Sequence, residues 1–476
     1  MTATEETKTT GRHLAHSHAK EGNIQGTVNL QAVEGDDTAC GQALFPVPAN
    51  GPNDPLQWSQ TRKILILVCS LYSFFLSNSA LLGPSVYIGI YIQEFSITPI
   101  TASDLVSYAN LAFGFRSLLM VPLFHKIGQR PVMLFSLLLY CAGLIGCAKS
   151  TTYASLMACR VIHCFGASVC EALPVQLVND IFYLHERGKR LGIYTVCLCA
   201  GATGPLFAGY MLDGGLSWRL FFYVEFVFAW ALFILAFCVV EETAYHRKTP
   251  QGAQIARRSE ASLDEKEVVR GELVKDSQFF MMIAKVVYLF LYPALIYMGL
   301  GALTFNFIFP LKITSPPYLW CRTSSSLIAL GSLSDYLLAI PFTSSSDRLA
   351  AFLTRRNSSI REAEMRLGVL LPVMLIGPAG PSYSIDSFTS NVSKVLICMN
   401  LGKQAISFGM GLKLLDWVTQ KGYAVMIAGV FGGLLLVNNL AVVGFLVWRK
   451  RLRRRMAGSW LGRVHGESVK GEVATH

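Results

Sequence analysis

The feature that most constrains this chain is a series of apolar runs of about 20 residues, separated by short polar gaps. A helix of that length crosses the roughly 30 Å hydrocarbon core of a lipid bilayer. Inside the bilayer every backbone N–H and C=O needs a partner within the protein, so these runs have to be helical. We therefore expect an all-α integral membrane protein.

Composition points to the same class. Hydrophobic residues make up 52% of the chain and charged residues only 15%, whereas soluble proteins carry about 25% charged residues. A net charge of +11 could indicate nucleic-acid binding, but the Lys and Arg residues lie between the apolar runs, where they orient spans. We expect a lipid bilayer around the chain, no nucleic-acid partner, no cofactor and no metal.

Six apolar runs precede a charged central stretch and five follow it. Their ranges are 64–88, 104–124, 131–149, 153–178, 191–212, 218–240, 284–309, 325–343, 367–380, 395–416 and 423–448. The run 367–380 is short and contains Pro372 and Pro378, so we expect 10–11 helices in two halves. The predicted segments are a disordered cytoplasmic tail over 1–61, a six-helix half over 62–240, a cytoplasmic linker over 241–281, a shortened helix half over 282–448 and a basic cytoplasmic tail over 449–476.

The gaps alternate between basic and nearly uncharged. Arg62 and Lys63, Lys126 and Arg130, and the cluster 187–190 all fall in alternate gaps. Basic gaps lie on the cytoplasmic side of membranes, so both termini are expected there. Eleven crossings would place the basic C-terminal tail outside. Either the run 367–380 does not cross, or a segment after it is missing.

Charged residues inside spans are costly and are therefore candidates for function. Arg160 and Glu171 both lie on the fourth run, and eleven residues at about 100° each bring them within about 20° of one helix face. Arg160 either faces a polar cavity or extends to an interface. Glu225 on the sixth run either takes part in proton coupling or pairs with Arg219 at an interface.

Polar and small residues give weaker signals. Asn306, Asn400 and Gln404 could hydrogen-bond a substrate or join helices. Glycines at 201, 204 and 209, with Pro205 among them, predict a fifth span that packs closely against a neighbour and bends. A membrane-embedded enzyme has only His185 and Glu186 in its favour, and a loop ion pair explains these more simply.

Several motifs resemble the major facilitator superfamily, specifically its fungal twelve-span drug:proton antiporter branch. DPLQWSQTRK over 54–63 is similar to that branch's DPxxWSxxRK lead-in, and YLHERG over 183–188 is similar to its FFLHERG loop. Arg160 with Gly166 resembles the fourth-span element. The segment 201–209, with Gly201, Gly204, Pro205 and Gly209, resembles the antiporter motif.

The sequence departs from the family pattern at two places. The loop GxLxDRxGRR acts as a conformational latch in the family; here Lys126, Gly128 and Arg130 remain, but His125 replaces the acid. The second half keeps Asp347 and Arg348. The sequence passes from Gly380 to Pro381 where the family continues, so the end of span nine and most of span ten are expected to be missing.

The resemblance implies two six-helix halves, the second shortened, that move around a cavity. It implies a monomeric secondary transporter of the plasma membrane that exports a small lipophilic or cationic molecule, such as a drug or a fungal secondary metabolite, with protons as the coupling ion. Glu171 is the first candidate for the proton-linked carboxylate. The alternative is a transport-incompetent or regulatory remnant of such a transporter.

Overall fold

The computed structural model describes residues 19–21, 27–39, 41–48, 54–201, 203–243 and 348–362, with isolated positions after residue 283. The five runs predicted after residue 283, and the junction of Gly380 with Pro381, lie wholly or largely outside these residues.

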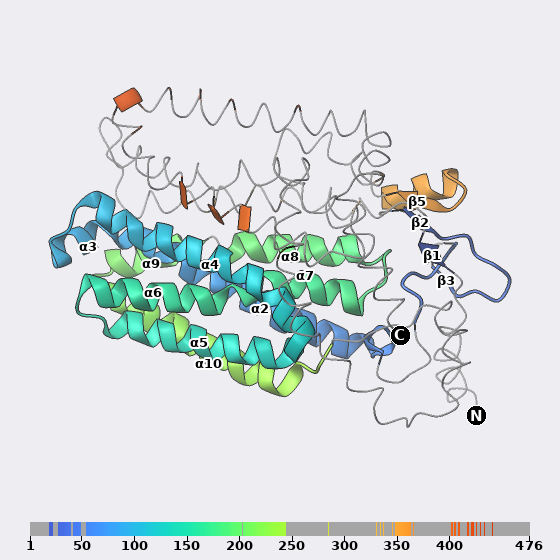
Figure 1. Ribbon diagram of the computed structural model, residues 1–476, viewed down its shortest axis with the longest axis horizontal. Coiled ribbons are helices and arrows are strands. Elements are labelled where there is room, and N and C mark those ends of the chain that lie inside the picture. The colour runs from blue at the N-terminus through green and yellow to red at the C-terminus, as the bar shows by residue number, and fades with distance from the viewer. Residues whose placement is uncertain are drawn as a thin grey trace.

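Most of the described helices follow the six predicted runs of the first half, and the helix over 88–95 extends beyond the first run, which is predicted to end at residue 88. The described helices of this half are α2 (Gln60–Leu82), α3 (Ile88–Phe95), α4 (Pro99–Ile127), α5 (Gln129–Lys149), α6 (Tyr153–Ala167), α7 (Val169–Ile181), α8 (Arg187–Gly201), α9 (Gly204–Asp213) and α10 (Trp218–Val239). Two 3-10 turns, η2 (Pro55–Gln57) and η3 (Gly83–Tyr87), flank α2. The longer helices lie side by side along the long axis of the molecule (Figure 1).

Hydroxyl side chains begin several of these helices at the predicted polar gaps. Ser59, Thr98 and Thr152 each accept a hydrogen bond from a backbone N–H in the first turn of α2, α4 and α6. These N–H groups have no partner inside the helix, so the caps satisfy them. Among the described residues, three helical stretches are long and apolar enough to cross a membrane: Gln60–Phe95, Gln129–Lys149 and Trp218–Val239.

Proline interrupts the first and fifth predicted spans. Pro84 lies in η3, directly after α2, and Pro205 lies in the first turn of α9, directly after α8. Because proline has no N–H, the carbonyl four residues before it loses its helical partner. The fourth predicted span is also divided, with α6 ending at Ala167 and α7 beginning at Val169.

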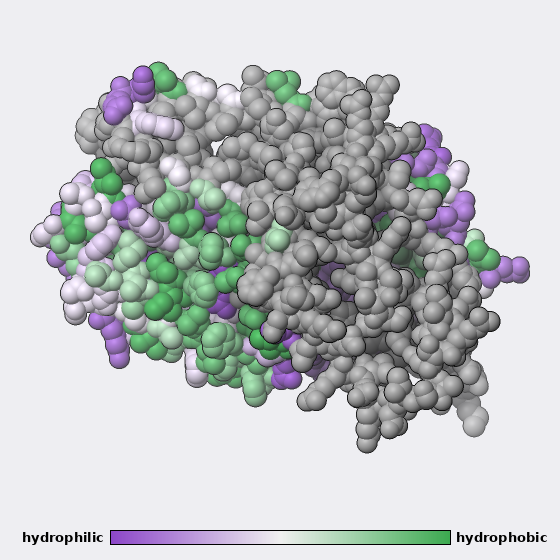
Figure 2. All heavy atoms as spheres, viewed as in Figure 1, coloured by the Kyte–Doolittle hydropathy of each residue, from purple (hydrophilic) through white to green (hydrophobic). Residues whose placement is uncertain are grey.

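Large apolar side chains cover the outer surface of the bundle. On α5 and α10, Phe135 and Val227 are each 62% exposed, and Phe228 and Trp230 are also exposed. Figure 2 shows hydrophobic side chains gathered over the middle of the coloured helices. On a soluble protein such a patch would be a liability, whereas against lipid it is the favourable surface.

Glycines bring α5 and α6 close together. A Cβ added at Gly143 would lie 2.5 Å from the backbone N of His163, and one at Gly166 would lie 2.7 Å from the Cα of Tyr140. Helices in membranes associate largely through such close packing of small residues. The cysteines Cys141, Cys147 and Cys164 are buried in the same core.

Within the segment 1–61, predicted as a disordered tail, the described residues include short strands. Strand β2 (Thr27–Asn29) pairs antiparallel with β1 (Lys20–Glu21) and with β5 (Ile360–Glu362), and β3 (Thr38–Ala39) pairs with β4 (Gln42–Ala43). These strands lie at one end of the helical bundle (Figure 1). The reason is burial: side chains of the tail form a small apolar cluster with Leu184, which offsets the entropy of ordering the segment.

Candidate functional site

Arg160 of α6 caps the end of α2. Its Nη1 donates to the carbonyl of Ala80 at 2.9 Å and its Nη2 to the carbonyl of Leu81 at 3.1 Å. Pro84 removes the helical partner of the Ala80 carbonyl, and the last carbonyls of a helix attract positive charge. The guanidinium is 1% exposed, so it is held among helices rather than extended to an interface.

Glu225 of α10 is a buried carboxylate next to the same helix end. Its Oε1 accepts a hydrogen bond from Ser79 Oγ at 2.6 Å, and the residue is 6% exposed. Its second oxygen, Oε2, is buried and has no hydrogen-bond partner among the residues the structure describes. A buried oxygen in that position is costly unless something binds it.

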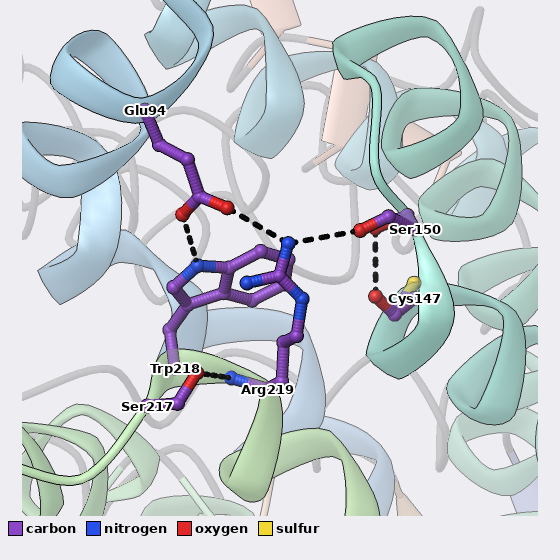
Figure 3. A network of polar contacts seen from close by, with 6 residues as sticks. All are labelled: Glu94, Cys147, Ser150, Ser217, Trp218 and Arg219. Atoms are coloured by element: carbon purple, nitrogen blue, oxygen red, sulfur yellow. Dashed lines mark hydrogen bonds and ion pairs between the residues drawn. The ribbon is translucent and has the colours of Figure 1, made fainter.

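The alternative partner for Glu225 is engaged elsewhere. Arg219 donates to Glu94 Oε1 at 2.7 Å and to the carbonyl of Ser150 at 3.1 Å, while Trp218 Nε1 donates to Glu94 Oε2 at 2.6 Å (Figure 3). This network joins α3, α10 and the end of α5. The interpretation of Glu225 as the partner of Arg219 is therefore corrected: Glu225 bonds Ser79, and Arg219 bonds Glu94.

The glycines of the fifth predicted span pack against α2. A Cβ at Gly201 would lie 2.7 Å from the carbonyl oxygen of Phe75, and one at Gly204 would lie 2.8 Å from the Cα of Ser79. Gly209 is buried within α9, which has Pro205 in its first turn. No side chain fits where the two backbones approach this closely.

Three contacts therefore converge on residues Ser79–Leu81 of α2. Glu225 holds the side chain of Ser79, Gly204 lies against its backbone, and Arg160 holds the next two carbonyls. We call this group, Ser79–Leu81 with Arg160, Gly204 and Glu225, the α2-end site. It links α2 with α6, α9 and α10.

Glu171 lies in α7, but its side chain is outside the described part of the structure. Its shared face with Arg160 stays a prediction. Asn306, Asn400 and Asp347 are likewise outside the described residues, whereas Arg348 lies in a helical segment described over 348–356.

Gln404 packs closely against the first half. It is 2% exposed, and a Cβ at Gly114 of α4 would lie 2.5 Å from its Cβ. The rings of Tyr108 and Phe408 contact each other edge to face, with their centroids 5.3 Å apart. The side-chain oxygen of Gln404 is buried without a hydrogen-bond partner among the described residues. A substrate contact at Gln404 stays a prediction.

Arg116 is a buried charge that the sequence reasoning missed. It donates to the carbonyl of Phe165 at 2.8 Å and to Ser136 Oγ at 2.7 Å, and its guanidinium lies over the Phe165 ring at 4.4 Å. Phe165 belongs to the last turn of α6, so Arg116 caps α6 much as Arg160 caps α2. The signal was present, because an arginine within the run 104–124 satisfies the same rule that singled out Arg160.

The predicted latch residues Lys126, Gly128 and Arg130 lie at the junction of α4 and α5. Gly128 has φ +101°, a conformation that favours glycine. Glu242, just after α10, accepts hydrogen bonds from the backbone N–H groups of Gln129 at 2.9 Å and Arg130 at 3.2 Å. The family pattern has an acidic residue where this chain has His125. Here the carboxylate of Glu242 contacts the same junction of α4 and α5.

Arginines near helix boundaries donate to carbonyls at the ends of other helices. Arg130 donates to the carbonyl of Phe237 in the last turn of α10 at 3.0 Å, and Lys126 lies in the last turn of α4. Arg187 donates to the carbonyl of Asn179 at 2.9 Å, near the end of α7. The ends of α2, α6, α7 and α10 are therefore each joined to an arginine side chain from another segment.

The sequence model of the protein family called the Major Facilitator Superfamily matches residues 66–412 of this chain. A multidrug transporter of Candida glabrata is 26% identical over 227 residues, 46% of this chain and 39% of that protein. A trichosetin biosynthesis cluster transporter of Gibberella fujikuroi is 28% identical over 200 residues, 41% of this chain and 42% of that protein. The matched part of this chain thus spans less than half the length of either relative.

Solved structures show the same fold. The proton:xylose symporter XylE, bound to 6-bromo-6-deoxy-D-glucose, superposes with a TM-score of 0.51 at 11% sequence identity. The match covers 83% of this chain and 96% of that chain. At this identity the likeness concerns the arrangement of helices alone.

Proposed function

This chain belongs to the major facilitator superfamily, and we propose that it couples the efflux of a small lipophilic or cationic molecule to protons. Two helical halves would move relative to each other around a central cavity, as secondary transporters do. The proposal places the chain in the plasma membrane with both termini in the cytoplasm, as the alternation of basic gaps indicates.

One observation supports proton coupling most strongly: the buried carboxylate of Glu225 has one oxygen bonded to Ser79 and one with no described partner. An ionised carboxylate is costly in such a place, and a proton on Oε2 would neutralise it. Charged groups inside membrane spans are commonly parts of proton or substrate pathways.

Protonation of Glu225 would act on α2. A neutral carboxyl group accepts a weaker hydrogen bond from Ser79 than a carboxylate does. Ser79 lies against Gly204 and next to the carbonyls that Arg160 caps, so a change at Glu225 reaches the contacts that join α2 to α6 and α9. We propose this as the link between the proton and the helix packing.

The substrate class rests on different support. The two fungal relatives are named for multidrug transport and for a trichosetin biosynthesis cluster. These names favour a drug or a secondary metabolite as cargo. A broad lipophilic probe is therefore the first choice for an assay.

The test is transport by the purified full chain in lipid vesicles, with rhodamine 6G as a lipophilic cationic probe. With the vesicle interior acidic, an antiporter should accumulate the probe as protons leave, and collapse of the pH gradient should stop uptake. Vesicles without protein provide the background. Uptake at background rate would favour the alternative of a transport-incompetent remnant.

A further inference from the structure

The N-terminal segment over residues 27–48, which we call the N-terminal strap, contacts the first helical half. The backbone N–H of Leu184, in the loop between α7 and α8, donates to the carbonyl of Phe45 at 2.9 Å. Leu184 also closes an apolar cluster with Ala19, Val28, Leu30 and Ala43. This side of the strap is therefore held by burial as well as by a backbone hydrogen bond.

The same strap contacts a loop that follows residue 348, in the second half of the chain. Strand β2 pairs with β5 in the register Val28 with Arg361. The backbone N–H of Leu30 donates to the carbonyl of Ser359 at 2.9 Å, and Gln31 Nε2 donates to the carbonyl of Ser358 at 3.3 Å. These contacts are mostly between backbone groups and cover only a few residues.

Leu30 belongs to both contacts. Its side chain is 4% exposed in the cluster with Leu184, and its backbone N–H bonds the Ser359 carbonyl. Val28 does the same, since it is 2% exposed in that cluster and lies opposite Arg361 in the sheet. One short strand thus joins loops whose positions in the chain are about 175 residues apart, from Leu184 to Ser359.

We propose that the N-terminal strap fastens the two halves together at this end of the bundle and releases when this end opens. The inference rests on the proposed function only in taking the halves to move relative to each other. A pairing of two or three residues at a sheet edge is weak enough to break and reform during transport. The strap therefore acts as a reversible closure of one conformation, built from the chain's own N-terminal segment.

A cysteine pair tests the contact itself. The variant Val28→Cys with Arg361→Cys, carrying a protease site within 241–281, is oxidised in vesicles and then cleaved. The two fragments should stay joined without reductant and separate with it. The control pair, Val33→Cys with Arg361→Cys, should not join, because Val33 lies outside β2 and is not paired with β5. Fragments that separate equally in both variants would overturn the proposal.

Two functional readouts test release. Rhodamine 6G transport by the Val28–Arg361 cysteine variant should fall to background when cross-linked and recover with reductant; full transport while cross-linked would overturn the proposal. Independently of transport, Leu30→Pro removes the N–H that bonds Ser359 and should raise thiol labelling of Tyr183→Cys several-fold, measured at that residue by peptide mass spectrometry. Val33→Ala should not. Equal labelling in both would also overturn it.

These outcomes separate the strap from proton coupling. A chain that cross-links and shows the labelling increase, but transports in neither redox state, contradicts the proposed transport function and not the strap. Adding Glu225→Gln to the Val28→Cys, Arg361→Cys variant should leave its cross-linking unchanged, because Glu225 lies on α10 and makes its described hydrogen bond to Ser79.

Discussion

Ser79 and Glu225, 146 residues apart in the chain, meet at 2.6 Å where α2 and α10 cross. The backbone of the same serine lies against Gly204, and the two following carbonyls are bonded by Arg160. The residues that a family resemblance assigns to separate motifs thus act on one short stretch of one helix. In the proposed mechanism, a proton at Glu225 is linked to a movement of α2 through Ser79.

The close approach of α9 to α2 predicts a strong size limit at Gly204. Gly204→Ala should lower the free energy of unfolding by about 1–3 kcal/mol, because the added methyl group meets the Ser79 backbone. Gly204→Leu should prevent stable folding. Thermal unfolding in detergent measures both. Gly214→Ala is the matched control, since a Cβ at Gly214 would lie 3.5 Å from its nearest neighbour, the carbonyl oxygen of Tyr210. Equal losses of stability at the two positions would contradict the packing argument.

The capping role of Arg160 predicts that lysine cannot replace it. Arg160→Lys keeps the charge but reaches fewer of the carbonyls of Ala80, Leu81 and Leu105. Leaving a buried carbonyl unbonded should reduce stability by about 1–3 kcal/mol. Arg62→Lys, an exposed residue paired with Glu241, should change it by less than about 1 kcal/mol. An unchanged free energy of unfolding for Arg160→Lys in the same assay would show that Arg160 does not stabilise the protein by capping α2.

The hydrogen bonds of Glu242 to the start of α5 predict faster amide exchange there when this carboxylate is replaced. Glu242→Gln should speed amide hydrogen exchange at Gln129 and Arg130 roughly two- to fivefold, because a charge-assisted cap of their N–H groups is lost. The neighbouring variant Glu241→Gln should leave those amides unchanged, since Glu241 pairs with Arg62. Equal exchange rates in the two variants would show that Glu242 does not stabilise these N–H groups.

The coupling energy of the Glu94–Arg219 pair can be compared with that of ordinary exposed ion pairs. The two side chains are about one-third exposed, at 33% and 31%, so a double-mutant cycle with Glu94→Gln and Arg219→Met should give a coupling of about 0.2–1 kcal/mol. Urea or thermal unfolding supplies the four stabilities. A coupling well above that range would show that Trp218 and Ser150 make this network stronger than an exposed ion pair.

Sequence reasoning located the spans because hydrophobic length is a local property. The helices α5 and α10 begin and end within two residues of the runs predicted at 131–149 and 218–240. Interruptions were harder to place. Pro205 indicated the break in the fifth span, whereas the fourth span divides at Ser168, where the sequence has no proline; the nearest proline in that run is Pro174, inside α7.

The site was less accessible from sequence, because its contacts join distant segments. Nothing near Glu225 in the sequence points to Ser79, and Arg219, only six residues before Glu225, suggested a pair that the fold does not make. The strand at Thr27–Asn29 was missed for the same reason: it is short, polar, and paired with residues more than 300 positions later. Arg116 was the exception, since its position inside an apolar run was visible.

We propose that Glu225 binds the coupled proton, and gradient-driven uptake of rhodamine 6G by Glu225→Gln in vesicles over a pH series tests this. Glutamine keeps the shape and the Ser79 contact but cannot exchange a proton. The account predicts that gradient-driven uptake is lost while exchange of labelled for unlabelled probe continues. Glu171→Gln is measured in parallel. Unchanged gradient-driven uptake and pH profile in Glu225→Gln, with the loss found in Glu171→Gln instead, would contradict the account.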